Sequence, residues 1–187
     1  MDSPQRTQIL EAVWAVVARQ GLEAVSVRSV AAAAQVSPGR VQHYFRSRSE
    51  LVLASAQELI DRAASRHEAA LGDPGSPRTL ETLLLHAVVP GTAANPGVAL
   101  SFSYIAAAVG DPRIGDVLAS AQRGRIEAVA ACLATQAPRV TDPARTAREL
   151  VLLAEGATQA VFLGWATAAQ ARTSILAAIA RTTAPGG

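Results

Sequence analysis

Residues 26–48 read SVRSVAAAAQVSPGRVQHYFRSR, and this stretch decides the fold of the amino-terminal quarter of the chain. A hydroxyl N-cap followed by residues at helical spacing predicts a short helix over Ser26–Ala34. The same signal, with Pro38 at the first helical position, predicts a second short helix over Ser37–His43. Only Gln35 and Val36 separate the two segments. The stretch therefore predicts two short helices joined by a tight turn.

Two short helices in this arrangement form a helix-turn-helix, whose second helix can enter the major groove of DNA. The apolar residues of the stretch, Val41 and Phe45 among them, supply a small core. Arg40, Gln42 and His43 are then left on the outer face. Arginine can bind guanine through two hydrogen bonds, and glutamine can bind adenine in the same way. The second helix is therefore a candidate for reading base edges.

The rest of the chain indicates helices only. Alanine occupies 41 of the 187 positions, and alanine is the strongest helix former. Ser47–Glu50 has the pattern of a capping box and opens a helix reaching about Ala70. Capping residues followed by proline open later helices at Ser76, Asn95, Asp111 and Asp142, and a last helix covers about 170–181. We predict an all-α fold of about nine helices, with a helix-turn-helix domain over 1–47 and a larger helical bundle over 48–187.

Charge and composition limit the classes of protein. Residues 1–48 hold six arginines and three acidic residues, a net charge of +3, whereas residues 49–187 hold eleven arginines and twelve acidic residues. This basic excess near the amino terminus is compatible with a polyanionic partner. The single Cys132 excludes an internal disulfide and a cysteine-cluster metal site. No signal peptide or membrane span is indicated, so we expect a soluble, cytoplasmic protein without a membrane partner.

The amino-terminal third resembles the TetR-type family of transcriptional regulators. The resemblance covers about residues 6–60. The matching residues are Arg6, Ile9, Leu10, Gly21, Ser26-Val27-Arg28, Val30-Ala31, Val36-Ser37-Pro38-Gly39-Arg40-Val41, His43-Tyr44-Phe45, Ser47-Arg48 and Glu50-Leu51. One departure is Gln42, where the family often has tyrosine.

The resemblance implies a site for double-stranded DNA. The residues expected to hold phosphates are Ser26, Arg28, Ser37, Tyr44 and Arg48. Those expected to face bases are Pro38, Gly39, Arg40, Gln42 and His43, and the narrow Pro38 and Gly39 let the helix approach DNA closely. The implied protein is a repressor that binds a palindromic operator as a homodimer and leaves it when a small molecule binds the larger domain.

The helices from Ser76 onward are apolar on more than one face, as are helices buried on one side and paired on the other. We predict a homodimer formed by the last two long helices as a four-helix bundle. Polar or aromatic residues within the apolar runs are candidates to line a pocket for the effector. These are His86, Phe102, Tyr104, Gln122, Arg125, Glu155, Gln159, Phe162 and Trp165.

Several of these candidates have a second interpretation. Phe102, Phe162 and Trp165 also fit a core or an interface. Glu155 needs a partner or a raised pKa amid its apolar neighbours, and it fits a site for a cationic effector, a pair with Arg125 or Arg148, or an exposed position.

Two other classes of function fit the sequence less well. An enzyme is not indicated, because the sequence lacks the common phosphate-loop, nucleotide-binding, nucleophile-elbow and zinc-protease motifs, and we expect no cofactor or metal. A helical adaptor that ignores DNA fits the apolar helices. The basic amino-terminal quarter and the outward face from Arg40 to His43 argue against it.

Overall fold

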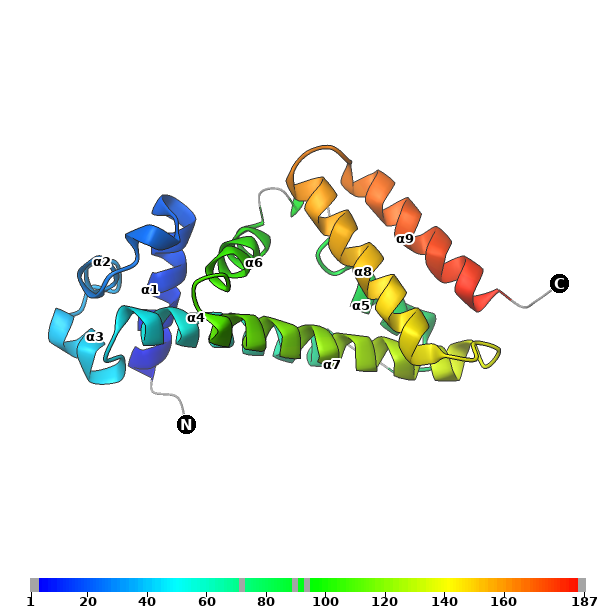
Figure 1. The fold of residues 1–187 in the computed structure, drawn as a ribbon, viewed down its shortest axis with the longest axis horizontal. Helices are drawn as coiled ribbons and strands as arrows, with labels where there is room; N and C mark the ends of the chain where they lie inside the picture. Colours follow the sequence, from blue (N-terminus) through cyan, green and yellow to red (C-terminus); the bar gives the residue numbers. More distant parts are fainter. Residues whose placement is uncertain (1–3, 71–72, 89–90, 93–94, 185–187) are drawn as a thin grey trace. The chain divides into compact units, whose positions relative to one another are not determined.

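A computed structural model describes residues 4–70, 73–88, 91–92 and 95–184. Within these residues it contains nine α-helices, one short 3-10 helix and no strand, which confirms the all-α prediction (Figure 1). The helices are α1 (Pro4–Gln20), η1 (Leu22–Ala24), α2 (Val27–Ala33), α3 (Pro38–Tyr44), α4 (Arg48–Ala70), α5 (Pro77–Leu85), α6 (Pro96–Ala107), α7 (Pro112–Gln136), α8 (Pro143–Phe162) and α9 (Ala168–Thr183). None of the described helices is both long and apolar enough to cross a membrane.

The chain packs as two compact units. Unit 1 comprises residues 1–63 and 99–119, and unit 2 comprises residues 64–98 and 120–187. Unit 1 thus contains the helix-turn-helix together with most of α4, nearly all of α6 and the start of α7. This division differs from the predicted boundary after residue 47, because α4 and α6 contribute side chains to the core that α1, α2 and α3 share.

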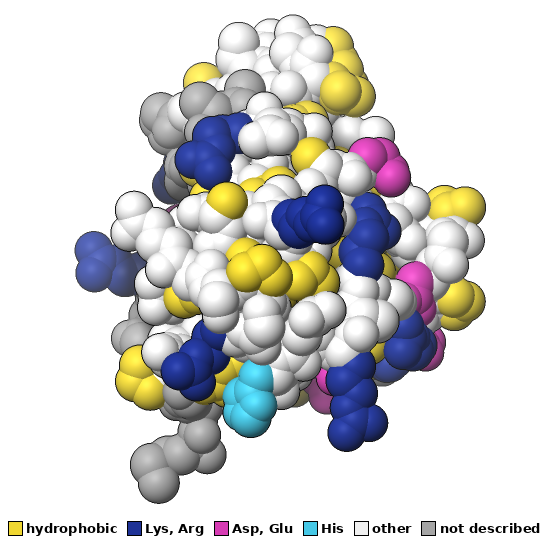
Figure 2. Space-filling model, turned by 90° about the vertical axis from the view of Figure 1, so that its left-hand side faces the viewer, with side chains coloured by type: hydrophobic (Ala, Val, Ile, Leu, Met, Phe, Trp, Pro, Cys, Tyr) yellow, Lys and Arg dark blue, Asp and Glu magenta, His cyan; other side chains and the backbone are white. Residues whose placement is uncertain are grey.

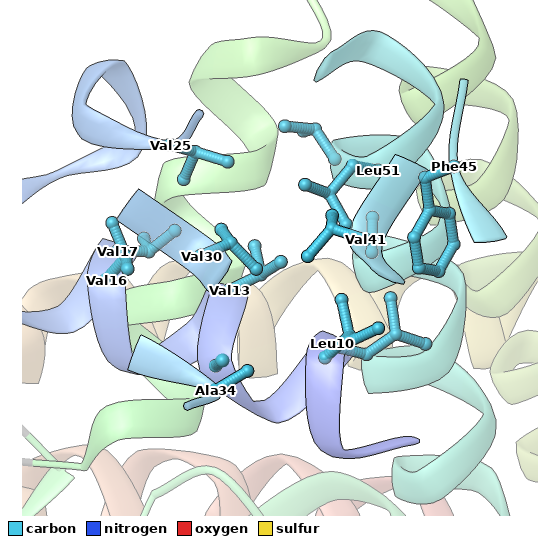
Figure 3. Close-up of a cluster of buried hydrophobic side chains, with 14 of the residues drawn as sticks. Leu10, Val13, Val16, Val17, Val25, Val30, Ala34, Val41, Phe45 and Leu51 are labelled. Carbon is cyan, nitrogen blue, oxygen red and sulfur yellow. The ribbon is translucent and has the colours of Figure 1, made fainter. Parts of the chain in front are cut away.

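The core of unit 1 consists largely of valine and leucine from α1 to α4. Figure 3 shows Val13, Val30, Val41 and Leu51 pointing toward one another from four different helices. Each of these four side chains is fully buried. Removing such side chains from water is the main driving force that holds two helices as short as α2 and α3 in place.

The turn between α2 and α3 ends the first helix in a Schellman motif. The Val36 N–H donates to the Ala31 carbonyl and the Gln35 N–H donates to the Ala32 carbonyl. Gln35 adopts a positive φ of 55°, the left-handed conformation that this motif requires. The turn predicted at Gln35 and Val36 therefore forms with a residue other than glycine in the left-handed conformation.

Unit 2 has its own core, built from leucines of α5 and apolar residues of α7, α8 and α9. Leu80, Leu133 and Ile175 are fully buried there. From the cap at Asp142 the sequence predicts a helix reaching about Thr167, and the structure corrects this end. The α8 helix ends at Phe162, Gly164 takes a positive φ of 80°, and Thr167 instead caps α9 with Gln170 in a capping box.

Candidate nucleic-acid interface

Hydroxyl caps set the start of both short helices. The Ser26 Oγ accepts a hydrogen bond from the Ser29 N–H at 3.1 Å, and the Ser37 Oγ accepts one from the Arg40 N–H at 3.2 Å. These bonds confirm the predicted caps. A capping serine uses its oxygen as the acceptor. In Ser37 the hydroxyl proton can still be donated to a phosphate oxygen, so the predicted phosphate contact is compatible with the cap.

The α3 helix presents one apolar face and one polar face. Val41 is fully buried and Phe45, directly after the helix, is 2 % exposed. The predicted base-facing residues all lie on the exposed side; they are Pro38, Gly39, Arg40, Gln42 and His43. A short helix with polar side chains on its free face has the geometry that a major groove accepts.

Gly39 is not required by the packing of the protein itself. A Cβ atom at this position would lie 4.0 Å from its nearest neighbour, the Ser37 Oγ. Alanine would therefore fit, and glycine in a helix is less stable than alanine. The fold gives no reason for glycine here, whereas close approach of the α3 backbone to an external surface does.

Positive charge gathers on the face of the molecule seen in Figure 2, where the basic side chains are accompanied by a histidine and the acidic ones lie toward one side. Arg28 on α2 and Arg40 on α3 are both exposed. Tyr44 is half-buried and its ring meets the His43 ring edge-on at 5.2 Å between centroids. An amphipathic ring at the border of core and surface can hold a phosphate with its hydroxyl.

Arg48 has an internal function that the sequence did not predict. Its Nε donates to the Val25 carbonyl and its Nη2 to the Leu22 carbonyl, each at 2.8 Å, and Nη2 lies 3.8 Å from the Glu23 carboxylate. The guanidinium thus connects the start of α4 to η1. The expected phosphate contact stays a prediction, because these bonds use two of the five guanidinium N–H donors and the side chain is 46 % exposed.

A polar cluster connects the first turn of α4 to the start of α7. The Asp111 carboxylate accepts hydrogen bonds from the Ser49 hydroxyl at 2.8 Å and from the Arg113 guanidinium. The bonds from Arg113 and Ser49 hold the pKa of Asp111 well below its ordinary value. The sequence predicted Asp111 only as a helix cap, because the partner Ser49 lies 62 residues away in the sequence.

Three of the predicted pocket residues, His86, Arg125 and Glu155, come together in unit 2. The Arg125 Nε donates to the Leu83 carbonyl at 2.9 Å, and the His86 Nδ1 lies 3.3 Å from the same oxygen. The Arg125 Nη1 donates to the Glu155 Oε1 at 2.5 Å. Of the alternatives left open for Glu155, the structure thus shows the pair with Arg125. Gln122 lies one turn before Arg125 on α7.

The other predicted pocket residues do not join this group in unit 2. Tyr104 is fully buried in the core of unit 1, with its hydroxyl 2.7 Å from the Ser55 Oγ, so its predicted pocket role is corrected to a packing role. Phe102 belongs to unit 1 as well. Trp165 is 73 % exposed in the turn after α8, and Gln159 is exposed, so neither is enclosed within the chain. Phe162 is half-buried at the end of α8.

Comparison with known proteins identifies the helix-turn-helix. Residues 9–55 match the model of the family described as bacterial regulatory proteins, tetR family. The helix-turn-helix of this chain is therefore similar to that of TetR-family regulators. The HTH-type transcriptional regulator PksA of Bacillus subtilis is 43 % identical over 56 residues, which are 30 % of this chain and 27 % of PksA. The chain therefore matches only about a quarter of the length of this curated relative.

Solved structures extend the likeness to the whole chain. A Rhodococcus sp. protein assigned to the TetR family of transcriptional regulators is 27 % identical, with a TM-score of 0.82 over 97 % of this chain and 100 % of that one. The multidrug binding protein EbrR, solved with imidazole, is 29 % identical, with a TM-score of 0.67 over 99 % of this chain and 98 % of EbrR. EbrR has also been solved with ethidium. The likeness in fold thus covers unit 2 as well as the helix-turn-helix.

Proposed function

We propose that this protein is a TetR-type transcriptional repressor that binds a palindromic operator in double-stranded DNA as a homodimer. In this proposal the α3 residues that face bases are Pro38, Gly39, Arg40, Gln42 and His43, and the residues that hold phosphates are Ser26, Arg28, Ser37, Tyr44 and Arg48. The repressor acts in the cytoplasm, and a small-molecule effector bound by unit 2 releases it from DNA. The observation that carries the proposal is the exposed polar face of α3, held on a buried core by Val41 and Phe45.

Two features of the site support direct reading of bases. Arg40 is exposed on α3, and no side chain of the protein crowds the neighbouring Gly39. The guanidinium N–H groups of Arg40 can therefore reach a guanine. The caps at Ser26 and Ser37 hold both short helices in register. A rigid helix that carries a few polar side chains is what specific recognition requires.

A DNA-binding titration tests the proposal. Operator fragments are obtained by selection from random DNA, and affinity is measured by fluorescence anisotropy at several salt concentrations. We expect Arg40→Ala to weaken binding by about 1–3 kcal/mol, the value of one good base contact. Arg78→Ala removes the same charge from an exposed site on α5 in unit 2 and serves as the matched control. Equal affinities for the two variants, or no salt-dependent retention of any DNA, would favour a helical adaptor instead.

The homodimer is proposed to form through exposed residues of α8 and α9. Leu152 is 65 % exposed and Leu163 is 62 % exposed, and with Gly156 and Gln159 they recur at helical spacing along one side of α8. On α9 the exposed side carries mainly small residues, Ala169, Thr173, Ala177 and Ala180. Figure 1 shows α8 and α9 lying side by side within unit 2. Two copies of this pair form a four-helix bundle.

The proposed effector site is the group of residues around Arg125. This position lies among the apolar side chains of α5, α7 and α8 and brings polar atoms to an otherwise apolar region. The likeness to EbrR, solved with imidazole and with ethidium, supports a ligand-binding role for this part of the fold. Release from DNA requires that the effector bind more tightly to the form with low DNA affinity.

A further inference from the structure

Unit 2 contains a buried hydrogen-bond acceptor that lacks a donor in the described part of the chain. The Oε1 atom of Gln122 is buried and has no hydrogen-bond partner among the residues that the structure describes. Nearly all buried polar atoms in proteins have a partner, and an exception calls for an explanation. Gln122 lies on α7 three residues before Arg125, which places both side chains on one face of the helix.

The neighbouring charges are already compensated. The Arg125 side chain is 12 % exposed and its Nη1 contacts the Glu155 carboxylate, which is 41 % exposed. Its Nε is occupied by the Leu83 carbonyl, while its Nη2 donates to no residue in the described part of the chain. The Arg125 guanidinium and the Glu155 carboxylate form an ion pair, and burial lowers the pKa of Arg125 while Glu155 opposes that shift. The Gln122–Arg125–Glu155 cluster is therefore neutral overall.

We propose that the Gln122–Arg125–Glu155 cluster binds an uncharged amide-type group of the effector. An N–H of the ligand donates to the Gln122 Oε1, and the ligand carbonyl accepts from the Arg125 Nη2. This inference rests on the ligand-binding role proposed for unit 2 and is independent of DNA binding. It names the chemical class of the effector as a neutral carboxamide or a related group with adjacent donor and acceptor.

The ion pair in the cluster disfavours both a cationic and an anionic ligand. A cation would lie beside the Arg125 guanidinium, and it would have to displace that guanidinium from Glu155. An anion would lie beside the Glu155 carboxylate. In both cases one charge would remain uncompensated in a poorly hydrated site, which is costly. Ethidium, which EbrR binds, is a cation, so the preference proposed here differs from that ligand in charge.

The cluster has a side that solvent can reach. The Glu155 side chain is partly exposed, and His86, which shares the Leu83 carbonyl with Arg125, is exposed at the end of α5.

Three probes of the same shape test the class of ligand. Benzamide, benzamidinium and benzoate share one planar ring and differ in charge. Binding is measured on the full chain without DNA by saturation-transfer NMR and titration. We expect benzamide to bind and the two charged probes to bind at least about tenfold more weakly, a difference of about 1.4 kcal/mol. If none of the probes binds, or if either charged probe binds best, the proposal is wrong.

Variants at Gln122 separate recognition from folding. Gln122→Met keeps the volume but removes the acceptor, so benzamide affinity should fall about tenfold or more, while the thermal midpoint stays unchanged or rises because the unpaired acceptor is gone. Gln122→Glu should shift the preference from benzamide to benzamidinium. Gln57→Met, on an exposed face of α4 in unit 1, is the matched control and should leave the three affinities unchanged. Benzamide binding that survives Gln122→Met would overturn the proposal.

Because no DNA is present, this experiment succeeds or fails separately from the proposed repressor function. A chain that binds benzamide but no operator would contradict DNA binding alone. A chain that binds its operator but prefers a charged probe would contradict the class of effector alone.

Discussion

At the scale of single residues, Gly39 links the stability of α3 to its proposed function. A methyl group fits there without a clash inside the protein. We predict that Gly39→Ala raises the free energy of unfolding by about 0.5 kcal/mol, because alanine is the better helix former. The same methyl group should hold α3 away from the bases and weaken operator binding by about tenfold. Urea titration and fluorescence anisotropy measure the two effects, and unchanged DNA affinity would show that α3 does not approach DNA closely.

Tyr104 makes the stability of unit 1 sensitive to alkaline pH. Burial raises the pKa of Tyr104 to about 12, although the Ser55 hydroxyl partly opposes that shift. The folded state therefore retains the phenol proton at a pH where the unfolded chain, with a tyrosine pKa of about 10, has lost it. The stabilising contribution is complete below about pH 10 and is lost as the pH rises toward 12.

The matched variant for this pH effect is Tyr104→Phe. We expect the free energy of unfolding of the wild-type protein to fall more steeply between pH 10 and 12 than that of the variant. Near neutral pH the variant should lose about 1 kcal/mol, the value of a typical hydrogen bond. Denaturant titrations across this pH range provide the measurement. Parallel pH profiles would show that the Tyr104 hydroxyl is not buried.

At the scale of elements, the contact between η1 and the start of α4 depends on Arg48. Its Nε donates to the Val25 carbonyl and its Nη2 to the Leu22 carbonyl, which also accepts from the Val25 N–H. We predict that Arg48→Ala lowers the free energy of unfolding by about 1 kcal/mol, since the side chain is half exposed and water replaces part of the interaction. Arg46→Ala removes an exposed arginine two residues away and should leave stability within about 0.5 kcal/mol of wild type. Equal thermal midpoints for the two variants would contradict the structural role of Arg48.

The sequence reveals an interaction when its two partners lie close together along the chain. The caps at Ser26, Ser37 and Asp142 act within three residues, and the sequence predicted all three correctly. Ser76 was predicted as a cap too, but it makes no side-chain capping bond, although α5 starts at Pro77 as expected. The Arg48 bonds cross 23 and 26 residues. No local pattern marks such pairs, so the sequence does not predict the internal bonds of Arg48.

The predicted pocket residues also have partners that lie far away in the sequence. Arg125 and Glu155 were among the candidates because polar residues in apolar runs are unusual, and the structure joins them across 30 residues. Tyr104 met the same criterion yet lies in the core of unit 1. The sequence cannot distinguish a buried polar residue whose partner is Ser55 from one that faces a ligand, because both occur at apolar helical positions.

At the scale of the whole molecule, Gly156 allows a direct test of the dimer. A Cβ atom at this position meets nothing within 4 Å inside the protomer. Gly156→Trp should therefore leave the thermal midpoint of the isolated protomer close to wild type, while the large ring in the middle of the α8 face blocks association. Sedimentation at micromolar concentration is expected to show a dimer for wild type and a monomer for Gly156→Trp. A variant that remains dimeric would place the interface elsewhere, and a monomeric wild type would contradict the homodimer.

The central claim is that the exposed face of α3 reads base edges in two half-sites. The most direct measurement is selection of bound sequences from random DNA, carried out with the wild-type protein and with Arg40→Ala. We predict that wild type selects a palindrome whose half-sites lie one DNA turn apart, about 34–36 Å, and that Arg40→Ala selects the same palindrome with one position relaxed in each half. If both proteins select the same bases at every position, α3 does not read bases through Arg40. If wild type selects no common sequence, the claim that α3 reads base edges is wrong.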